Sequence, residues 1–140
     1  MLTLLAVIAA PMAHASSFRL PDGATLTSET VELDSVYAMP IGVWQEASAV
    51  PTEAVEGRVT RQAWRLGGTG LSSYQILINL RQQLLEAGYE IAFECEGSTC
   101  GGFDFRFGTE VIGEPAMHVD LGDFHFLSAT RPGEAPDAVS

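Results

Sequence analysis

Lysine is absent from this 140-residue chain, and all seven of its basic residues are arginine. Against them stand 18 acidic residues, which give a formal net charge of −11. A chain with this excess of negative charge is repelled by phosphate backbones and by anionic membrane surfaces. The composition therefore argues against nucleic-acid binding, and solubility is the plainest reason for the charge.

Long apolar runs are also missing beyond the first residues. A helix needs about 20 apolar residues to span a bilayer, and no segment after position 15 provides them. The run Leu2–Ala10 is shorter, is followed by Pro11, and precedes the small-x-small pattern of Ala13-His14-Ala15. This order is typical of a secretory signal peptide, although no basic residue precedes the apolar run. We predict a signal peptide over residues 1–15, cleaved after Ala15, against the alternative of a buried N-terminal strand or helix.

Only two cysteines are present, Cys95 and Cys100. In an exported protein, an even number of cysteines at close spacing predicts a structural disulfide. The alternatives are a redox pair, which usually has two intervening residues rather than the four found here, and half of a zinc site. A zinc site needs two further ligands, and none lies nearby in the sequence.

Recognisable catalytic motifs are also absent. There is no Gly-x-Ser-x-Gly nucleophile motif, and no acid/base pair stands out among the many carboxylates. Gly68-Thr69-Gly70 is glycine-rich like a phosphate-binding loop, but it lacks the third glycine and the lysine of such loops. We interpret it as the loop that precedes a helix, and we predict a protein that is not an enzyme and has no cofactor.

One group of polar residues has ligating potential. His118, Asp120, Asp123 and His125 offer the imidazole and carboxylate ligands that divalent metals accept. The plainer interpretation is an outward polar face, because apolar residues take the positions between them. We therefore predict no metal site and keep these four residues as the only candidates for one.

The clearest structural element is a helix over residues 72–87. Ser72 and Gln75 have the spacing of a capping box, and Leu77, Leu80, Leu84 and Ala87 recur at helical intervals. Gly88 stands where a helix commonly ends. Such an apolar stripe predicts that the helix packs on a sheet.

Strands are expected on both sides of this helix. Alternation predicts a strand over 55–66, a second over 89–95 and a third at Phe103, Phe105 and Phe107; the second and third would form an antiparallel hairpin clamped by the disulfide. Two further short strands are expected at 117–121 and 124–130. The order of elements predicts an α+β fold with one amphipathic helix on a small antiparallel sheet.

The expected organisation is a single domain after the signal peptide. Residues 16–54, with Pro40 and Pro51, are expected to be irregular or extended, 55–131 to form the core domain, and 132–140 to be a linker-like tail or a truncated strand. The aromatic side chains leave two possibilities open, since they either pack in this core or line an apolar ligand groove. They are Tyr89, Phe93, Phe103, Phe105 and Phe107.

Three stretches carry a resemblance to a known family. EGRVTRQAWRL at 56–66, LRQQLLEAGYEIAFECEGSTCGGFDFRF at 80–107 and MHVDLGDFHFLSATR at 117–131 resemble the N-terminal region of OmpA-family envelope proteins of Gram-negative bacteria. The resemblance implies a periplasmic protein, associated with the outer membrane or the cell wall, and it implies no catalytic residue. The C-terminal OmpA-like domain that binds peptidoglycan in that family is absent from this sequence, so we expect the chain to be part of a longer protein.

Three functional hypotheses follow. The first is a non-catalytic envelope module that contacts a protein or peptidoglycan, as the N-terminal domain of an OmpA-like protein. The second is a stand-alone periplasmic protein that binds a small ligand or lipid through its aromatic face. The third, a metal-dependent enzyme, requires that His118, Asp120, Asp123 and His125 converge.

Overall fold

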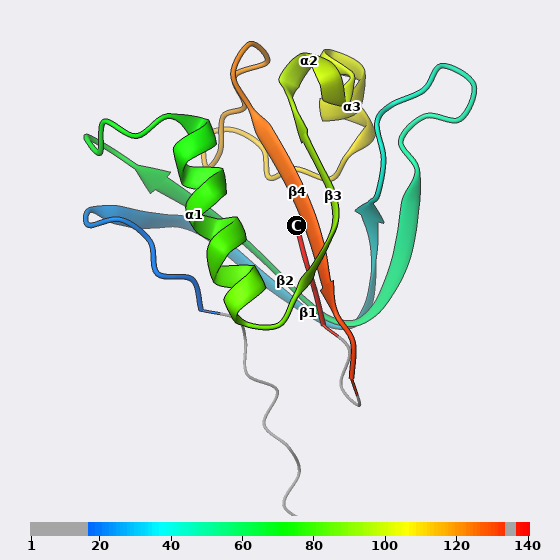
Figure 1. The fold of residues 1–140 in the computed structure, drawn as a ribbon, viewed down its shortest axis with the longest axis horizontal. Helices are drawn as coiled ribbons and strands as arrows, with labels where there is room; N and C mark the ends of the chain where they lie inside the picture. Colours follow the sequence, from blue (N-terminus) through cyan, green and yellow to red (C-terminus); the bar gives the residue numbers. More distant parts are fainter. Residues whose placement is uncertain (1–16, 134–136) are drawn as a thin grey trace, which may run out of the picture.

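The computed structural model describes residues 17–133 and 137–140. The predicted signal peptide at 1–15 lies outside this part of the chain. Two sheets are present, a two-stranded β1–β2 hairpin and a three-stranded sheet in the order β3-β4-β5, and every pairing is antiparallel. Figure 1 shows α1 on one side of the three-stranded sheet and the long hairpin behind it. The predicted α+β class with antiparallel sheets is confirmed. The elements are β1 (Ala24–Pro40), β2 (Thr52–Leu66), α1 (Ser73–Glu86), β3 (Glu90–Glu96), α2 (Gly97–Cys100), α3 (Gly102–Gly108), β4 (His125–Arg131) and β5 (Asp137–Val139).

The hairpin of β1 and β2 was not predicted from the sequence, although a strand over 55–66 was expected and lies within β2. Its strands pair from Ala24 opposite Leu66 to Pro40 opposite Thr52, with two bulges in β1. Residues 16–54 were expected to be irregular or extended, and residues 24–40 are extended, as the regular strand β1. Pro40 ends β1 and Pro51 directly precedes β2, so both prolines lie at strand ends, where the missing N–H interrupts no ladder.

The three-stranded sheet buries a different set of side chains on each face. Leu127 and Ala129 of β4 pack with Leu77 and Leu84 of α1. The alternate residue, Ser128, is fully buried and donates a hydrogen bond of 2.7 Å to the carbonyl of Pro40 in the hairpin. The period of two in β4 thus divides the core into a helix side and a hairpin side.

A β-bulge shifts this alternation in β3. Ile91 lies opposite Ala129, whereas Phe93 lies opposite Ser128, so β3 has one extra residue at this point. Ile91 consequently packs on the α1 side, and Phe93 packs with the cluster around the disulfide. The expectation that 89–95 is a strand is confirmed, but its apolar residues do not share one face.

Helix α1 begins and ends as the sequence predicts. Ser72 caps the backbone N–H of Gln75 at 3.2 Å, and the side chain of Gln75 accepts from the N–H of Ser72 at 2.9 Å. At the other end, Gly88 has φ +86°, and the N–H of Tyr89 donates to the carbonyl of Leu84. This bond closes a Schellman motif, which needs a residue with positive φ at Gly88.

The predicted hairpin between 89–95 and 103–107 is wrong. Residues 97–108 form two short helices, α2 and α3, and β3 pairs with β4 instead. Phe103 and Phe107 lie four positions apart on α3 with their ring centroids 4.3 Å apart, and Phe105 is buried on the opposite side. A run of only five residues with apolar side chains at every second position fits one and a half helical turns as well as a strand, so periodicity alone could not decide.

The predicted strand at 117–121 is not present either. Residues 117–120 have no regular structure, and a turn follows in which the N–H of Asp123 donates to the carbonyl of Asp120. The expected strand at 124–130 is confirmed as β4. Within the tail predicted at 132–140, Asp137–Val139 forms β5 on the edge of β4. In the described part of the chain, no helix has the length and hydropathy needed to cross a membrane.

Candidate functional site

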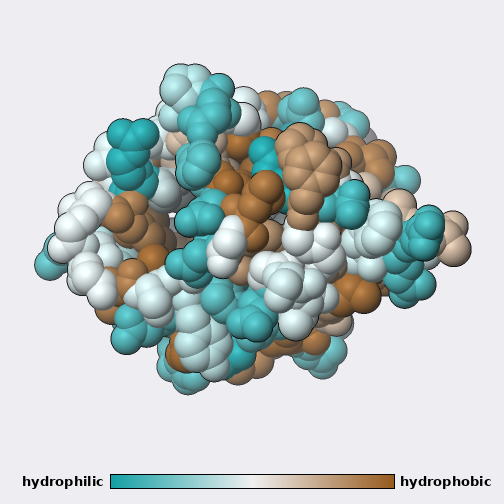
Figure 2. All heavy atoms as spheres, turned by 90° about the horizontal axis from the view of Figure 1, so that it is seen from above, coloured by the Kyte–Doolittle hydropathy of each residue, from teal (hydrophilic) through white to brown (hydrophobic). Residues whose placement is uncertain are grey.

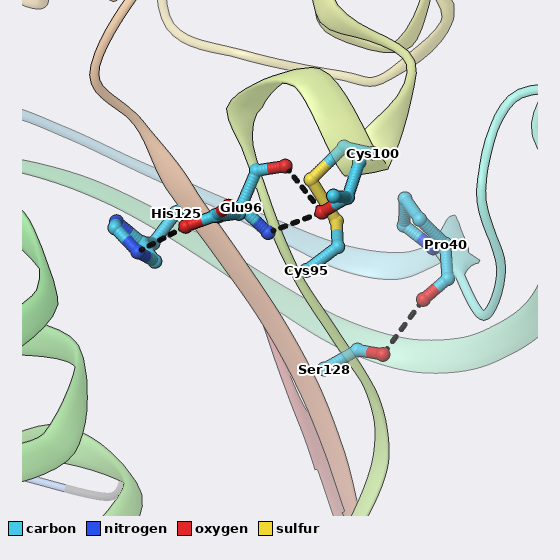
Figure 3. The surroundings of a disulfide bond; sticks show 7 residues. Pro40, Cys95, Glu96, Cys100, His125 and Ser128 are labelled. Carbon is cyan, nitrogen blue, oxygen red and sulfur yellow. Dashed lines mark hydrogen bonds and ion pairs between the residues drawn. A yellow bond between two sulfur atoms is a disulfide. The ribbon is translucent and has the colours of Figure 1, made fainter.

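The disulfide closes the turn between β3 and α2. Cys95 and Cys100 are bonded with their Cα atoms 5.2 Å apart, and Cys100 is fully buried. Figure 3 shows the bond beside the end of β3. In the same turn, Thr99 Oγ1 accepts from the N–H of Glu96 at 3.2 Å and donates to its carbonyl at 2.8 Å. The structural disulfide predicted from the cysteine spacing is confirmed, although it holds a helical turn against a strand rather than the base of a hairpin.

The two residues Cys100 and Gly101 set the direction in which the chain enters α3. The carbonyl of Cys100 accepts a hydrogen bond of 2.9 Å from the N–H of Trp44, and a side chain at Gly101 would meet the Cβ of Trp44 at 2.7 Å. Gly101 has φ +120°, which glycine alone adopts without strain. The chain therefore turns tightly into α3, and Phe105 points into the cluster around the disulfide.

A pocket of about 130 Å³ lies between α3, the 109–124 segment and the start of β4. Phe105 contributes its ring from α3, edge-on to Phe126 with their centroids 5.2 Å apart. Seen from the side where α2 and α3 lie, the molecule shows hydrophobic atoms gathered near the centre, between hydrophilic ones (Figure 2). The surface of the pocket is almost wholly apolar. It is lined by Phe105, Val111, Met117, Val119, Phe124 and Phe126, together with Arg106, Thr109 and His125.

The 109–124 segment is fastened to the hairpin at two points. Arg61 of β2 forms ion pairs with Glu110 at 2.7 Å and with Glu32 of β1 at 2.8 Å. The hydrogen bond from Arg61 lowers the pKa of the Glu32 carboxyl, and the same bond raises the pKa of the arginine. Thr27 of β1 donates to the carbonyl of Ala116 at 2.7 Å. An ion pair and a hydrogen bond thus hold this long segment without regular structure over the pocket, and long loops of this kind are often functional.

His125 on the pocket wall is oriented by a polar network at the start of α1. Ser73 Oγ donates to Asp123 Oδ1 at 2.5 Å and lies 3.0 Å from His125 Nδ1. A serine hydroxyl has one hydrogen, so His125 Nδ1 must be the donor to Ser73 Oγ. Nε2 then faces Glu96, whose Oε2 lies 3.9 Å away (Figure 3), and the ring lies against Tyr74.

This network contains a serine, a histidine and an aspartate but not the connections of a hydrolytic triad. In a triad the serine gives its proton to the histidine, and the acid contacts the other ring nitrogen. Here the Ser73 hydroxyl donates its hydrogen bond to Asp123, and His125 Nδ1 contacts the oxygen of the same hydroxyl. The arrangement holds the imidazole in place rather than activating Ser73 as a nucleophile.

The four predicted metal candidates do not converge. His118 is 75% exposed and pairs with Glu114 at 2.6 Å, while Asp120 accepts from the N–H of Gly122 at 2.9 Å. Asp123 and His125 meet only through Ser73. Among residues 17–133 and 137–140, no group of three or more His, Cys, Asp or Glu side chains could hold a metal ion. The geometry that the metal-enzyme hypothesis requires is not present.

The predicted aromatic groove is only partly related to the pocket. Of its five residues, Phe105 lines the pocket, Tyr89 and Phe93 pack in the core, and Phe103 and Phe107 are exposed. Sequence reasoning missed Ser73, which it placed only at the start of a helix. It also missed Arg106 and Val119, because both were assigned to strands that the structure does not contain.

Comparison of the chain with protein-family models, with curated proteins and with solved structures found no match.

Proposed function

We propose that this chain is a non-catalytic module of the bacterial cell envelope, acting as the periplasmic N-terminal domain of an OmpA-like protein. The buried Cys95–Cys100 disulfide carries this proposal, because such bonds form and persist in oxidising compartments such as the periplasm. The resemblance of residues 56–66, 80–107 and 117–131 to OmpA-family proteins supports the same location. The partner is an envelope component, either a protein or peptidoglycan.

A binding role rather than a catalytic one is supported by the network at His125. The hydroxyl of Ser73 is directed at Asp123, so its proton is not available to His125 in this arrangement. The other candidate residues, His118 and Asp120, have partners of their own. We therefore assign these groups to the support of the pocket wall and the adjoining turn.

Sedimentation with isolated peptidoglycan sacculi tests the envelope role. The chain from Ser16 onward is compared with the same chain extended by its natural continuation, if the reading frame continues. Binding by the extended protein alone would place the wall anchor downstream and leave this domain to contact another envelope component. Binding by the shorter chain would make the domain itself a wall binder. If neither protein sediments with sacculi and neither reaches the periplasm in cell fractionation, the proposal is overturned.

The pocket favours a second candidate function, a stand-alone periplasmic protein that binds a small ligand. Its six apolar wall residues come from α3, the 109–124 segment and the start of β4, and three polar residues complete the wall. Mostly apolar walls with a few polar groups are typical of small-molecule sites. The same pocket is available to a ligand whether the domain acts alone or within a longer protein.

A further inference from the structure

Of the three polar residues that line the pocket, Arg106 is the one whose side chain offers hydrogen-bond donors alone. The hydroxyl of Thr109 already donates to the carbonyl of Arg106 at 3.2 Å. Thr109 Oγ1 and His125 Nε2 are therefore left as acceptors, and a ligand group that accepts hydrogen bonds is favoured at Arg106.

Arg106 is also the unpaired charge of the pocket. It forms no ion pair with any residue in the described part of the chain, and its guanidinium carbon lies 5.1 Å from the ring centroid of the exposed Phe107. The carboxylates at the two ends of the neighbouring loop are already engaged, Glu110 with Arg61 and Asp123 with Ser73. An anionic ligand at Arg106 would thus meet a cation whose charge no neighbouring carboxylate already balances.

The size of the pocket limits the apolar part of a ligand. Its volume of about 130 Å³ is close to the ~150 Å³ of a dry protein cavity that binds benzene. An apolar group of about six carbon atoms therefore fills it. Longer chains would have to extend past the mouth toward solvent.

We propose that this pocket binds a carboxylate carried on an apolar group of about six carbons, with the carboxylate on Arg106 and the apolar group among Phe105, Val119 and Phe126. The planar guanidinium suits a carboxylate because it can donate two parallel hydrogen bonds. This inference rests on the second candidate function and is independent of whether the domain binds peptidoglycan.

Titration of the full, oxidised chain with hexanoate tests the proposal, with binding followed by NMR chemical shifts. We expect saturable shifts around Val119 and Phe126, weaker binding of acetate, and no comparable binding of hexylamine or hexanol. N-acetyl-leucine carries the same carboxylate beside a branched apolar group. Tighter binding of hexanoate would identify an acyl chain as the natural source, and tighter binding of N-acetyl-leucine a peptide C-terminus.

Two variants and a matched control separate recognition from folding. Arg106→Gln is expected to weaken hexanoate binding about tenfold, because it removes one charge-assisted interaction. Arg65→Gln removes an exposed arginine of β2 that has no ion pair in the described residues, and should leave the affinity unchanged. Val119→Phe is expected to abolish binding by filling the pocket, and circular dichroism verifies that each variant is folded.

Three outcomes would overturn the proposal. They are equal binding of hexanoate and hexylamine, unchanged affinity in a folded Arg106→Gln protein, and shifts that map away from the pocket. Sacculus binding is measured separately, so loss of hexanoate binding with sacculus binding retained refutes this inference alone.

Discussion

Reduction of the Cys95–Cys100 bond should destabilise the domain by a predictable amount. The bond closes a short loop, since the two cysteines are separated by five positions in the sequence. The chain-entropy relation for a loop of this length gives about 2 kcal/mol at 25 °C. For a chain of this size, that loss corresponds to a fall in Tm of about 6–10 °C. Because Cys100 is buried and its carbonyl holds Trp44, disorder of α2 would add to this loss.

Urea unfolding of the oxidised and reduced protein, followed by circular dichroism, measures the effect. A Cys95→Ala/Cys100→Ala double variant is the control, because reductant should not change its stability. If reduction shifts the free energy of unfolding of the wild-type protein by less than about 0.5 kcal/mol, the loop-entropy account is refuted for this bond. A loss far above 5 kcal/mol would show that α2 and α3 unfold together with the bond.

Three further perturbations test the core, the helix start and a half-buried hydroxyl. Leu84→Ala, at a side chain that is 2% exposed, should cost about 2–5 kcal/mol in urea unfolding, whereas Leu85→Ala, at a neighbour that is 48% exposed, should cost far less. Ser72→Ala removes the cap of α1 and should cost about 1 kcal/mol, measured in the same way. Burial raises the pKa of the Tyr37 hydroxyl, so above about pH 10 the unfolded chain loses this proton first. Stability should therefore fall more steeply with rising pH in the wild-type protein than in Tyr37→Phe, and equal slopes would contradict this assignment.

The elements that could be predicted are those whose signals are local. The capping box at Ser72 and Gln75 lies within one turn, and Gly88 is needed at the end of the same helix. The disulfide follows from the spacing of two cysteines in one short segment. In each case the residues that specify the structure are the residues that form it, so no knowledge of distant contacts was needed.

The errors arose where distant contacts decide the structure. Phe103, Phe105 and Phe107 fit a strand or a helix, and the choice depends on β4 occupying the edge of β3. The bulge between Ile91 and Phe93 likewise has no signal in the local sequence. It places Ile91 opposite Ala129 and Phe93 opposite Ser128, so it depends on the pairing of β3 with β4. Pairing between residues 29 to 40 positions apart, from Glu96 with His125 to Glu90 with Thr130, thus overrode the alternation that the sequence displays.

The pocket is the feature least accessible to sequence reasoning, and its construction shows why. Its walls come from α3, from the loop fastened by Arg61 and Thr27, and from the start of β4. None of these segments is recognisable as a binding motif. Their side chains are positioned by distant residues, as the ring of His125 is by Ser73, 52 positions earlier in the chain. The sequence does not show that Arg106 lacks a carboxylate partner. This follows from the contacts of Glu110 with Arg61 and of Asp123 with Ser73. The charge composition indicated an acidic protein, but only the contacts show where an arginine remains unbalanced beside an apolar pocket.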